Sequence, residues 1–185
     1  MKKYTIGIDF GTLSGRCLLA DVETGEETAT SVLEYRHRVM SETLPDGTRL
    51  GVDWHLQHPG DYLDVLRITI RDAKKQAGIR PEQVIGIGID TTGCTIFPIK
   101  KDGTPLCFLE KWKGSPNAYV KLWKHHAAQP SADKLTEAAL ARNEKFIQRY
   151  GGKISSEWMF PKVWQVLDES PEIYEDTDAF LEVTD

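Results

Sequence analysis

Asp9 and the turn that follows it carry the residues best suited to chemistry. In YTIGIDFGTLSGR an apolar run ends at Asp9, and Gly11 lets the backbone turn sharply and approach an anion closely. The backbone N–H groups of the turn, helped by two hydroxyls, could surround phosphate oxygens; the residues are Gly11, Thr12, Leu13 and Ser14. A carboxylate binds Mg²⁺ directly or through a water, and Arg16 could neutralise phosphate charge. The pattern predicts a site for a magnesium-bound polyphosphate, with an ordinary β-hairpin as the alternative.

Asp90 is a second carboxylate at the end of an apolar run, in VIGIGIDTTGCT. Because parallel sheets bind ligands beyond the carboxyl ends of their strands, we expect the stretch Asp90-Thr91-Thr92-Gly93 to face the same cleft as Asp9. Three interpretations remain open. The two carboxylates could bind metal together, as in metal-dependent nucleases. The loop could instead line a small-molecule pocket in which Gly93 leaves room, or Asp90 could only cap the next turn.

Trp123 and Glu157 are polar or aromatic residues that could line a sugar pocket. A tryptophan ring can pack against the C–H groups of a sugar, although a helical Trp sharing a face with Tyr119 is more often part of the core. In SSEWM, Ser156 and Glu157 are either pocket groups or caps of the next helix. Both interpretations stay open for these residues.

The histidines are predicted to make hydrogen bonds or lie at the surface rather than to bind zinc. His55 and His58, in HLQH, have the spacing of metal ligands, but no Cys or further cluster accompanies them. The adjacent His125 and His126 could not both point at one site from a helix.

The elements that must position these residues follow an α/β pattern. Apolar alternation and turn residues predict three antiparallel strands, a helix that Gly78 ends, and a strand buried on both faces; their ranges are 4–10, 15–22, 27–39, 61–78 and 84–90. A further hairpin-like strand, three helices, the last interrupted near Pro161, and a final strand are predicted at 94–100, 118–128, 131–150, 156–169 and 178–185. The order predicts one domain over residues 1–185, with a mixed five-stranded sheet flanked by helices, as in the ribonuclease-H-like fold.

Composition excludes several classes of partner. The 185 residues carry a net charge of −5 with no basic stripe, so nucleic acid or an anionic membrane would lack its usual electrostatic attraction. The sequence has no apolar segment long enough for a membrane span or a secretory signal. Three cysteines without metal-type spacing favour a reducing compartment, so we expect a cytoplasmic protein.

Four motifs together resemble the FGGY family of carbohydrate kinases, and within it the branch that acts on ribulose: IGIDFGTLSGR, IGIGIDTTGCT, NAYVKLWKHHAAQ and RYGGKISSEWM. The first is shared with the wider actin, hexokinase and Hsp70 ATPase superfamily. The resemblance covers essentially the whole chain. It implies phosphorylation of a ketopentose, ribulose, by ATP to give ribulose 5-phosphate.

The resemblance also implies roles for particular residues. Asp9 would serve Mg²⁺, and the ATP phosphates would be held by Gly11, Thr12, Leu13, Ser14 and Arg16. The sugar would lie against Gly93, Trp123 and Glu157. One departure is His125, which stands where many family members have an Asp that contacts sugar hydroxyls.

Members of this family are much longer than 185 residues. The resemblance therefore places the catalytic base beyond Asp185, followed by an adenosine-binding domain, and predicts little or no kinase activity for the chain alone. A non-catalytic sugar- or phosphate-binding module is the main alternative, and a metal-dependent nuclease using Asp9 and Asp90 is a weaker one. An exposed sheet edge would favour association of copies, so a homo-oligomer is among the expected states.

Overall fold

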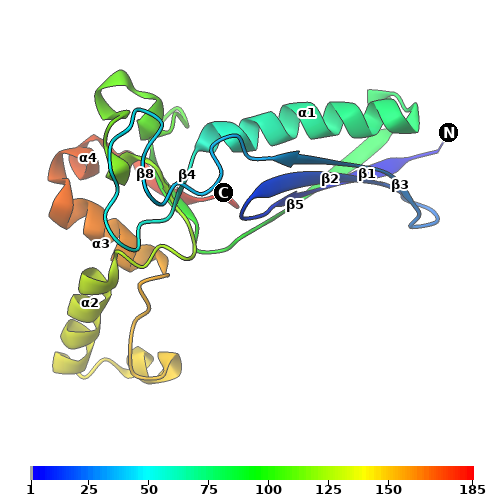
Figure 1. Cartoon of the computed structure of the whole chain (residues 1–185). Helices are drawn as coiled ribbons and strands as arrows, with labels where there is room; N and C mark the ends of the chain where they lie inside the picture. Colours follow the sequence, from blue (N-terminus) through cyan, green and yellow to red (C-terminus); the bar gives the residue numbers. More distant parts are fainter. Residues whose placement is uncertain (1) are drawn as a thin grey trace. The chain divides into compact units, whose positions relative to one another are not determined.

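The computed structural model describes residues 2–185, which divide into two compact units (Figure 1). Unit 1 comprises residues 2–39, 58–92 and 184, and unit 2 comprises residues 40–57, 93–183 and 185. The chain thus leaves unit 1 after Val39, returns at His58 and leaves again after Thr92. No helix within residues 2–185 is both long and apolar enough to cross a bilayer.

Unit 1 is a four-stranded sheet with one long helix. Its elements are β1 (Tyr4–Phe10), β2 (Ser14–Asp21), β3 (Glu27–Glu34), α1 (Pro59–Ala77) and β5 (Val84–Thr91). The strand order is β3-β2-β1-β5, in which only the β1–β5 pair is parallel. Figure 1 shows α1 running along one face of this sheet. Strand β3 ends at Glu34, so it is shorter than the strand predicted over residues 27–39.

Helix α1 has a clear start, end and buried stripe. His58 caps its first turn by accepting the Gly60 N–H at Nδ1, and Gly78 ends it with a left-handed φ of 63°. Val65, Thr69 and Ala73 lie four residues apart and are all fully buried. These local signals explain why the helix was predictable from the sequence.

Gly15 is the place where α1 comes closest to the sheet. A Cβ on Gly15 would lie 2.6 Å from both methyl carbons of Val65, far inside van der Waals contact. We therefore expect Gly15→Ala to destabilise the chain by about 1–3 kcal/mol, the usual cost of overpacking a core. Urea unfolding monitored by circular dichroism measures this difference. Gly7→Ala is the matched control, because its Cβ would meet only one atom, at 4.0 Å.

Relief of the overpacking provides a second check on Gly15. Val65→Ala removes both methyl groups that the new Cβ would strike. The double variant should consequently lose less free energy than the two single variants added together. Strict additivity would show that the Gly15 packing is not what limits stability.

Strand β5 departs from the sequence prediction, which had it buried on both faces. Ile85, Ile87 and Ile89 are 56%, 60% and 57% exposed. The reason is positional: β5 is an edge strand of this sheet, and α1 packs mainly over β3 and β2. Within residues 2–185 the apolar face of β5 is therefore open to solvent.

Unit 2 contains a second, smaller sheet and the remaining helices. Its elements are β4 (Leu56–Gln57), β6 (Ile96–Ile99), β7 (Val120–Lys121), α2 (Gln129–Ala141), α3 (Met159–Glu169), α4 (Pro171–Asp176) and β8 (Ala179–Glu182). The strand order is β4-β7-β6-β8, antiparallel throughout. Apolar side chains from distant parts of the sequence share one core, including Met40, Leu44, Leu56, Leu106, Val166 and Ile173.

The predicted five-stranded sheet is wrong in detail. The described residues form two four-stranded sheets, and the final strand, which exists as β8, pairs with β6 in the second of them. The short strands β4 and β7 have only two residues each, too few to show an alternating pattern in the sequence.

The helix predicted over residues 118–128 is also wrong. A 3₁₀ turn at Pro116–Ala118 leads directly into β7, where Lys121 pairs with Leu56 of β4. All four residues from Tyr119 to Leu122 are buried, and four buried residues in succession do not fit one face of a helix. Trp123 consequently lies in a loop rather than on a helix.

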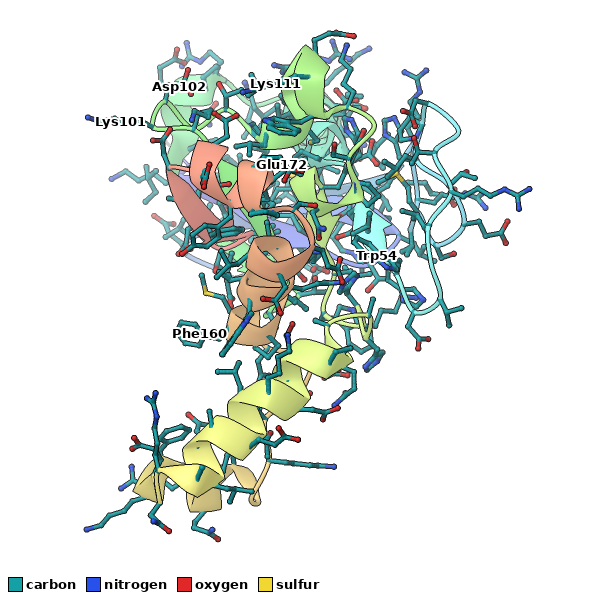
Figure 2. All side chains as sticks on the ribbon, turned by 90° about the vertical axis from the view of Figure 1, so that its left-hand side faces the viewer. Trp54, Lys101, Asp102, Lys111, Phe160 and Glu172 are labelled. Carbon is teal, nitrogen blue, oxygen red and sulfur yellow. The ribbon has the colours of Figure 1, made fainter. Side chains whose placement is uncertain are left out.

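The two later helices differ from expectation at their ends. The helix predicted over 131–150 stops at Ala141; Asn143 has a left-handed φ of 54°, and a 3₁₀ helix at Lys145–Tyr150 follows. Helix α3 runs unbroken through Pro161, because the N–H groups of a first turn have no helical partner to lose. Figure 2 shows Phe160 projecting from this first turn, where it is 73% exposed.

Candidate functional site

Asp9, Arg16 and Asp90 form one row across the sheet of unit 1. Strand β1 lies between β2 and β5, and its register sets Asp9 opposite Arg16 on one side and Asp90 on the other. The three side chains line a hollow of about 350 Å³ together with Gly7 and Gly88, whose lack of side chains keeps it open. The expectation that Asp90 faces the same hollow as Asp9 is confirmed, whereas the described lining of this hollow does not include Thr91, Thr92 or Gly93.

The charges in this row are partly paired. Arg16 Nε lies 3.2 Å from Asp9 Oδ2, and both side chains are about half exposed. Asp90 accepts the Thr91 N–H at Oδ1, 3.0 Å away, so it does cap the following backbone while its other oxygen is not needed for that bond. A cation entering at Asp9 would compete with Arg16 for the same carboxylate.

The turn between β1 and β2 is closed by Gly11. Its N–H donates to the Ser14 carbonyl at 3.0 Å, and a Cβ on Gly11 would also lie 3.0 Å from that oxygen. This differs from the expectation that the Gly11 N–H faces a phosphate; Gly11 instead makes the turn possible. Leu13 is exposed, and Thr12 and Ser14 are partly exposed.

Gly93, Trp123 and Glu157 belong to unit 2. A Cβ on Gly93 would meet no atom within 4 Å, so this position borders open space. Trp123 is 39% exposed, too much for the core role that was its alternative. Glu157 Oε1 lies 3.5 Å from His126 Nε2, while His126 Nδ1 lies 3.3 Å from the Ser156 hydroxyl. The sequence did not predict that His126 lies beside Glu157.

Lys162 is a buried group that sequence reasoning missed. Its side chain is fully buried on α3, and Nζ donates to the carbonyls of Cys94 at 2.6 Å and Leu122 at 2.8 Å. Burial lowers the pKa of Lys162 to about 8. The signal was present in MFPKVWQVL, where Lys162 lies four residues before the buried Val166 and therefore on the same helix face.

A second fully buried lysine, Lys121, forms a separate network. Its Nζ donates to Asn117 Oδ1 at 2.6 Å and Gln165 Oε1 at 3.1 Å, and the Trp54 ring (labelled in Figure 2) lies 4.3 Å away. Burial lowers the pKa of Lys121 to about 7. His125 accepts the His55 N–H at Nδ1 and donates from Nε2 to Gln165, which is the neutral imidazole form. Burial lowers the pKa of His125 to about 2, and the nearby positive charge of Lys121 is the second cause.

His37, His58 and Asp61 are the group in residues 2–185 whose ligand atoms lie close enough, within 4.8 Å of one another, to hold a metal. The contacts that these side chains already make are hydrogen bonds within the protein. His37 Nδ1 lies 2.8 Å from Asp61 Oδ1, and His58 Nδ1 already caps α1. The two rings stack at 4.1 Å, so their in-plane lone pairs do not converge on one point. The hydrogen-bonding role predicted for His58 is what the structure contains.

Comparison with known proteins gives consistent results. Residues 4–185 match the N-terminal domain of the FGGY family of carbohydrate kinases. The chain is 55% identical to a ribulokinase of Shouchella clausii over 100% of its length and 33% of that protein. It is 52% identical to a ribulokinase of Halalkalibacterium halodurans over 99% of its length and 33% of that protein. The chain thus spans about a third of the length of these relatives.

A solved structure shares the fold. A xyloylose kinase from Brucella ovis superposes with a TM-score of 0.72 at 18% identity, covering 95% of this chain and 31% of that one. This likeness confirms the α/β fold class expected from the sequence and shows that the chain shares the fold of this solved structure.

Proposed function

Because the chain belongs to the FGGY family of carbohydrate kinases, we propose that it is part of an enzyme that transfers phosphate from magnesium-bound ATP to ribulose. The observation that carries this proposal is the row of Asp9, Arg16 and Asp90 beside the Gly11 turn in unit 1. The ribulokinase relatives support ribulose as the sugar and ribulose 5-phosphate as the product. Such a reaction belongs in the cytoplasm, where we place the protein.

The residues of unit 1 fit a magnesium-bound polyphosphate. Two carboxylates facing one hollow offer the oxygen ligands that Mg²⁺ prefers, with space for the waters it retains. Bound Mg²⁺ would neutralise phosphate charge. Asp9 would hold the cation, and Arg16, released from Asp9, would pair with phosphate oxygens. We assign the phosphates to the turn as well, through Gly11 as its former and through Thr12, Leu13 and Ser14.

The sugar is assigned to residues of unit 2. Trp123 would pack its partly exposed ring against sugar C–H groups, and Glu157 would accept hydrogen bonds from sugar hydroxyls. Gly93 would leave the space that the sugar occupies. We place the catalytic base outside residues 1–185, so binding rather than turnover is the property to measure in this chain.

Calorimetric titration of the chain with Mg-ATP and, separately, with L-ribulose tests the proposal. We expect both to bind, and Asp9→Asn to weaken Mg-ATP at least tenfold while ribulose affinity stays unchanged. Asp133→Asn is the control, since Asp133 is an exposed carboxylate on α2 that hydrogen-bonds only a neighbouring glutamine in the described structure. Equal Mg-ATP affinity in Asp9→Asn and the unchanged chain would contradict the assignment.

Gly93→Ala separates a substrate role from a folding role. The new methyl group meets no protein atom within 4 Å and the backbone there is not left-handed, so the free energy of unfolding should change by less than about 0.5 kcal/mol. Ribulose affinity should nevertheless fall several-fold, because the methyl group enters the space assigned to the sugar. A Gly93→Ala chain that is equally stable and binds ribulose unchanged would remove Gly93 from the site.

A further inference from the structure

Lys162 joins two segments of unit 2 that are far apart in the sequence. One ammonium nitrogen donates to the carbonyl of Cys94 at 2.6 Å and to that of Leu122 at 2.8 Å. Cys94 directly follows Gly93, and Leu122 directly precedes Trp123. Both segments that carry proposed sugar-binding residues are therefore bonded to the same atom.

The arrangement is expensive for a purely structural purpose. A fully buried amine loses its hydration, and an apolar side chain of similar length would fill the same volume without that loss. Burial lowers the pKa of Lys162 and outweighs three neighbouring groups that favour its charged form, Cys94, Glu157 and Glu182. What only the amine adds is direction, through two hydrogen bonds to defined backbone carbonyls.

The backbone at Cys94 needs to be held. Its φ of 57° is left-handed, a conformation that residues with a Cβ adopt only at a cost. The Cys94 N–H donates to Glu182 Oε2 at 3.3 Å and the Cys94 carbonyl accepts from Lys162. Glu182 of β8 thus holds the N–H of Cys94, and Lys162 of α3 holds its carbonyl.

We propose that Lys162 is a positioning residue for the sugar, fixing the Gly93–Cys94 and Leu122–Trp123 segments relative to each other. The sugar part of this inference rests on the proposed function, whereas the fixing of the two segments does not. Lys162 acts through the backbone of its neighbours and has no assigned contact with the reacting atoms.

Hydrogen exchange in the 185-residue chain tests whether Lys162 fixes the segments. We expect Lys162→Met to speed amide exchange at 93–95 and 122–124 at least tenfold, with unit 1 unchanged. Lys121→Met is the matched control, since Lys121 is equally buried in unit 2 but donates to side chains of Asn117 and Gln165. Equal changes in these segments for both variants would overturn the proposal. If Lys162→Met does not fold, Lys162→Gln, which keeps a shorter donor, takes its place.

Ribulose titration of the same proteins tests the consequence for the sugar. Lys162→Met should weaken ribulose at least tenfold, and Lys121→Met less than twofold. Loosened segments with unchanged ribulose affinity would overturn the positioning role. If the chain without any substitution does not bind ribulose, the proposed sugar site is refuted, and with it the sugar role of Lys162. The hydrogen-exchange comparison would still decide whether Lys162 fixes the two segments.

Discussion

The free energy of unfolding is expected to rise by about 3 kcal/mol between about pH 6.5 and 8.5, since two lysines become neutral there only in the folded chain. Burial lowers the pKa of Lys121 to about 7 and that of Lys162 to about 8, from an ordinary value of 10.5. In this window the unfolded chain binds more protons than the folded one. Raising the pH therefore favours folding, and Lys121 accounts for about two thirds of the gain.

The rise should stop at about pH 9, because the titration of other groups changes stability in the opposite direction. Burial raises the pKa of the three thiols, at Cys17, Cys94 and Cys107, so above their ordinary value of 9.0 the unfolded chain loses those protons first. Stability then declines with further increase in pH. A stability maximum on the alkaline side of neutrality is the expected signature of this chain.

Urea unfolding at a series of pH values measures the effect. In Lys121→Met the slope between about pH 6.5 and 8.5 should fall to about a third of its original value. Lys153→Met, at an exposed position, should leave the slope as it was. A Lys121→Met chain with the original slope would show that Lys121 is not the group that titrates.

Ile87→Lys is expected to keep the chain monomeric up to a concentration at least tenfold higher than without the substitution. Ile87 is 60% exposed in the middle of an apolar edge strand, and edge strands of this kind pair with other chains unless a charge blocks them. Because the side chain is mostly outside the core, the substitution should cost less than about 0.5 kcal/mol of stability. Sedimentation velocity over a concentration series gives the distribution of species.

Val52→Lys is the control for this prediction. Val52 is also β-branched and 87% exposed, but it lies in a turn rather than in a strand. It should leave self-association unchanged. If the two variants shift association equally, general surface charge rather than the β5 edge is responsible.

The parts of the fold that were predictable have strong local signals. Strands β1 and β5 are apolar runs ended by Asp and turn residues, and α1 has a buried stripe, an N-terminal proline and a terminal glycine. The segment from Asn117 onward lacks such signals. Its conformation is set by distant partners, since β7 exists only because Val120 and Lys121 pair with β4. The sequence of residues 118–128 alone contains no pattern that predicts this pairing with β4.

The same distinction applies to the site. Asp9 and Asp90 could be placed together because both end neighbouring parallel strands, a relation that strand order alone supplies. Lys162 was missed although it shares a helix face with the buried Val166, because a lysine in a helix is normally at the surface. The sequence thus located the residues at strand ends and missed Lys162, a buried side chain that hydrogen-bonds the backbone of two loops.

The division of the chain into interleaved segments has a consequence during synthesis. Residues 40–57 leave the ribosome early, yet Met40 and Leu44 pack in a core that also needs Val166 and Ile173. More than 120 residues separate Leu44 from Val166, which at about 5–20 residues per second is a delay of about 6–24 seconds. During that time the early segment has no core to enter. Nascent-chain chaperones are therefore expected to contact this segment during that delay.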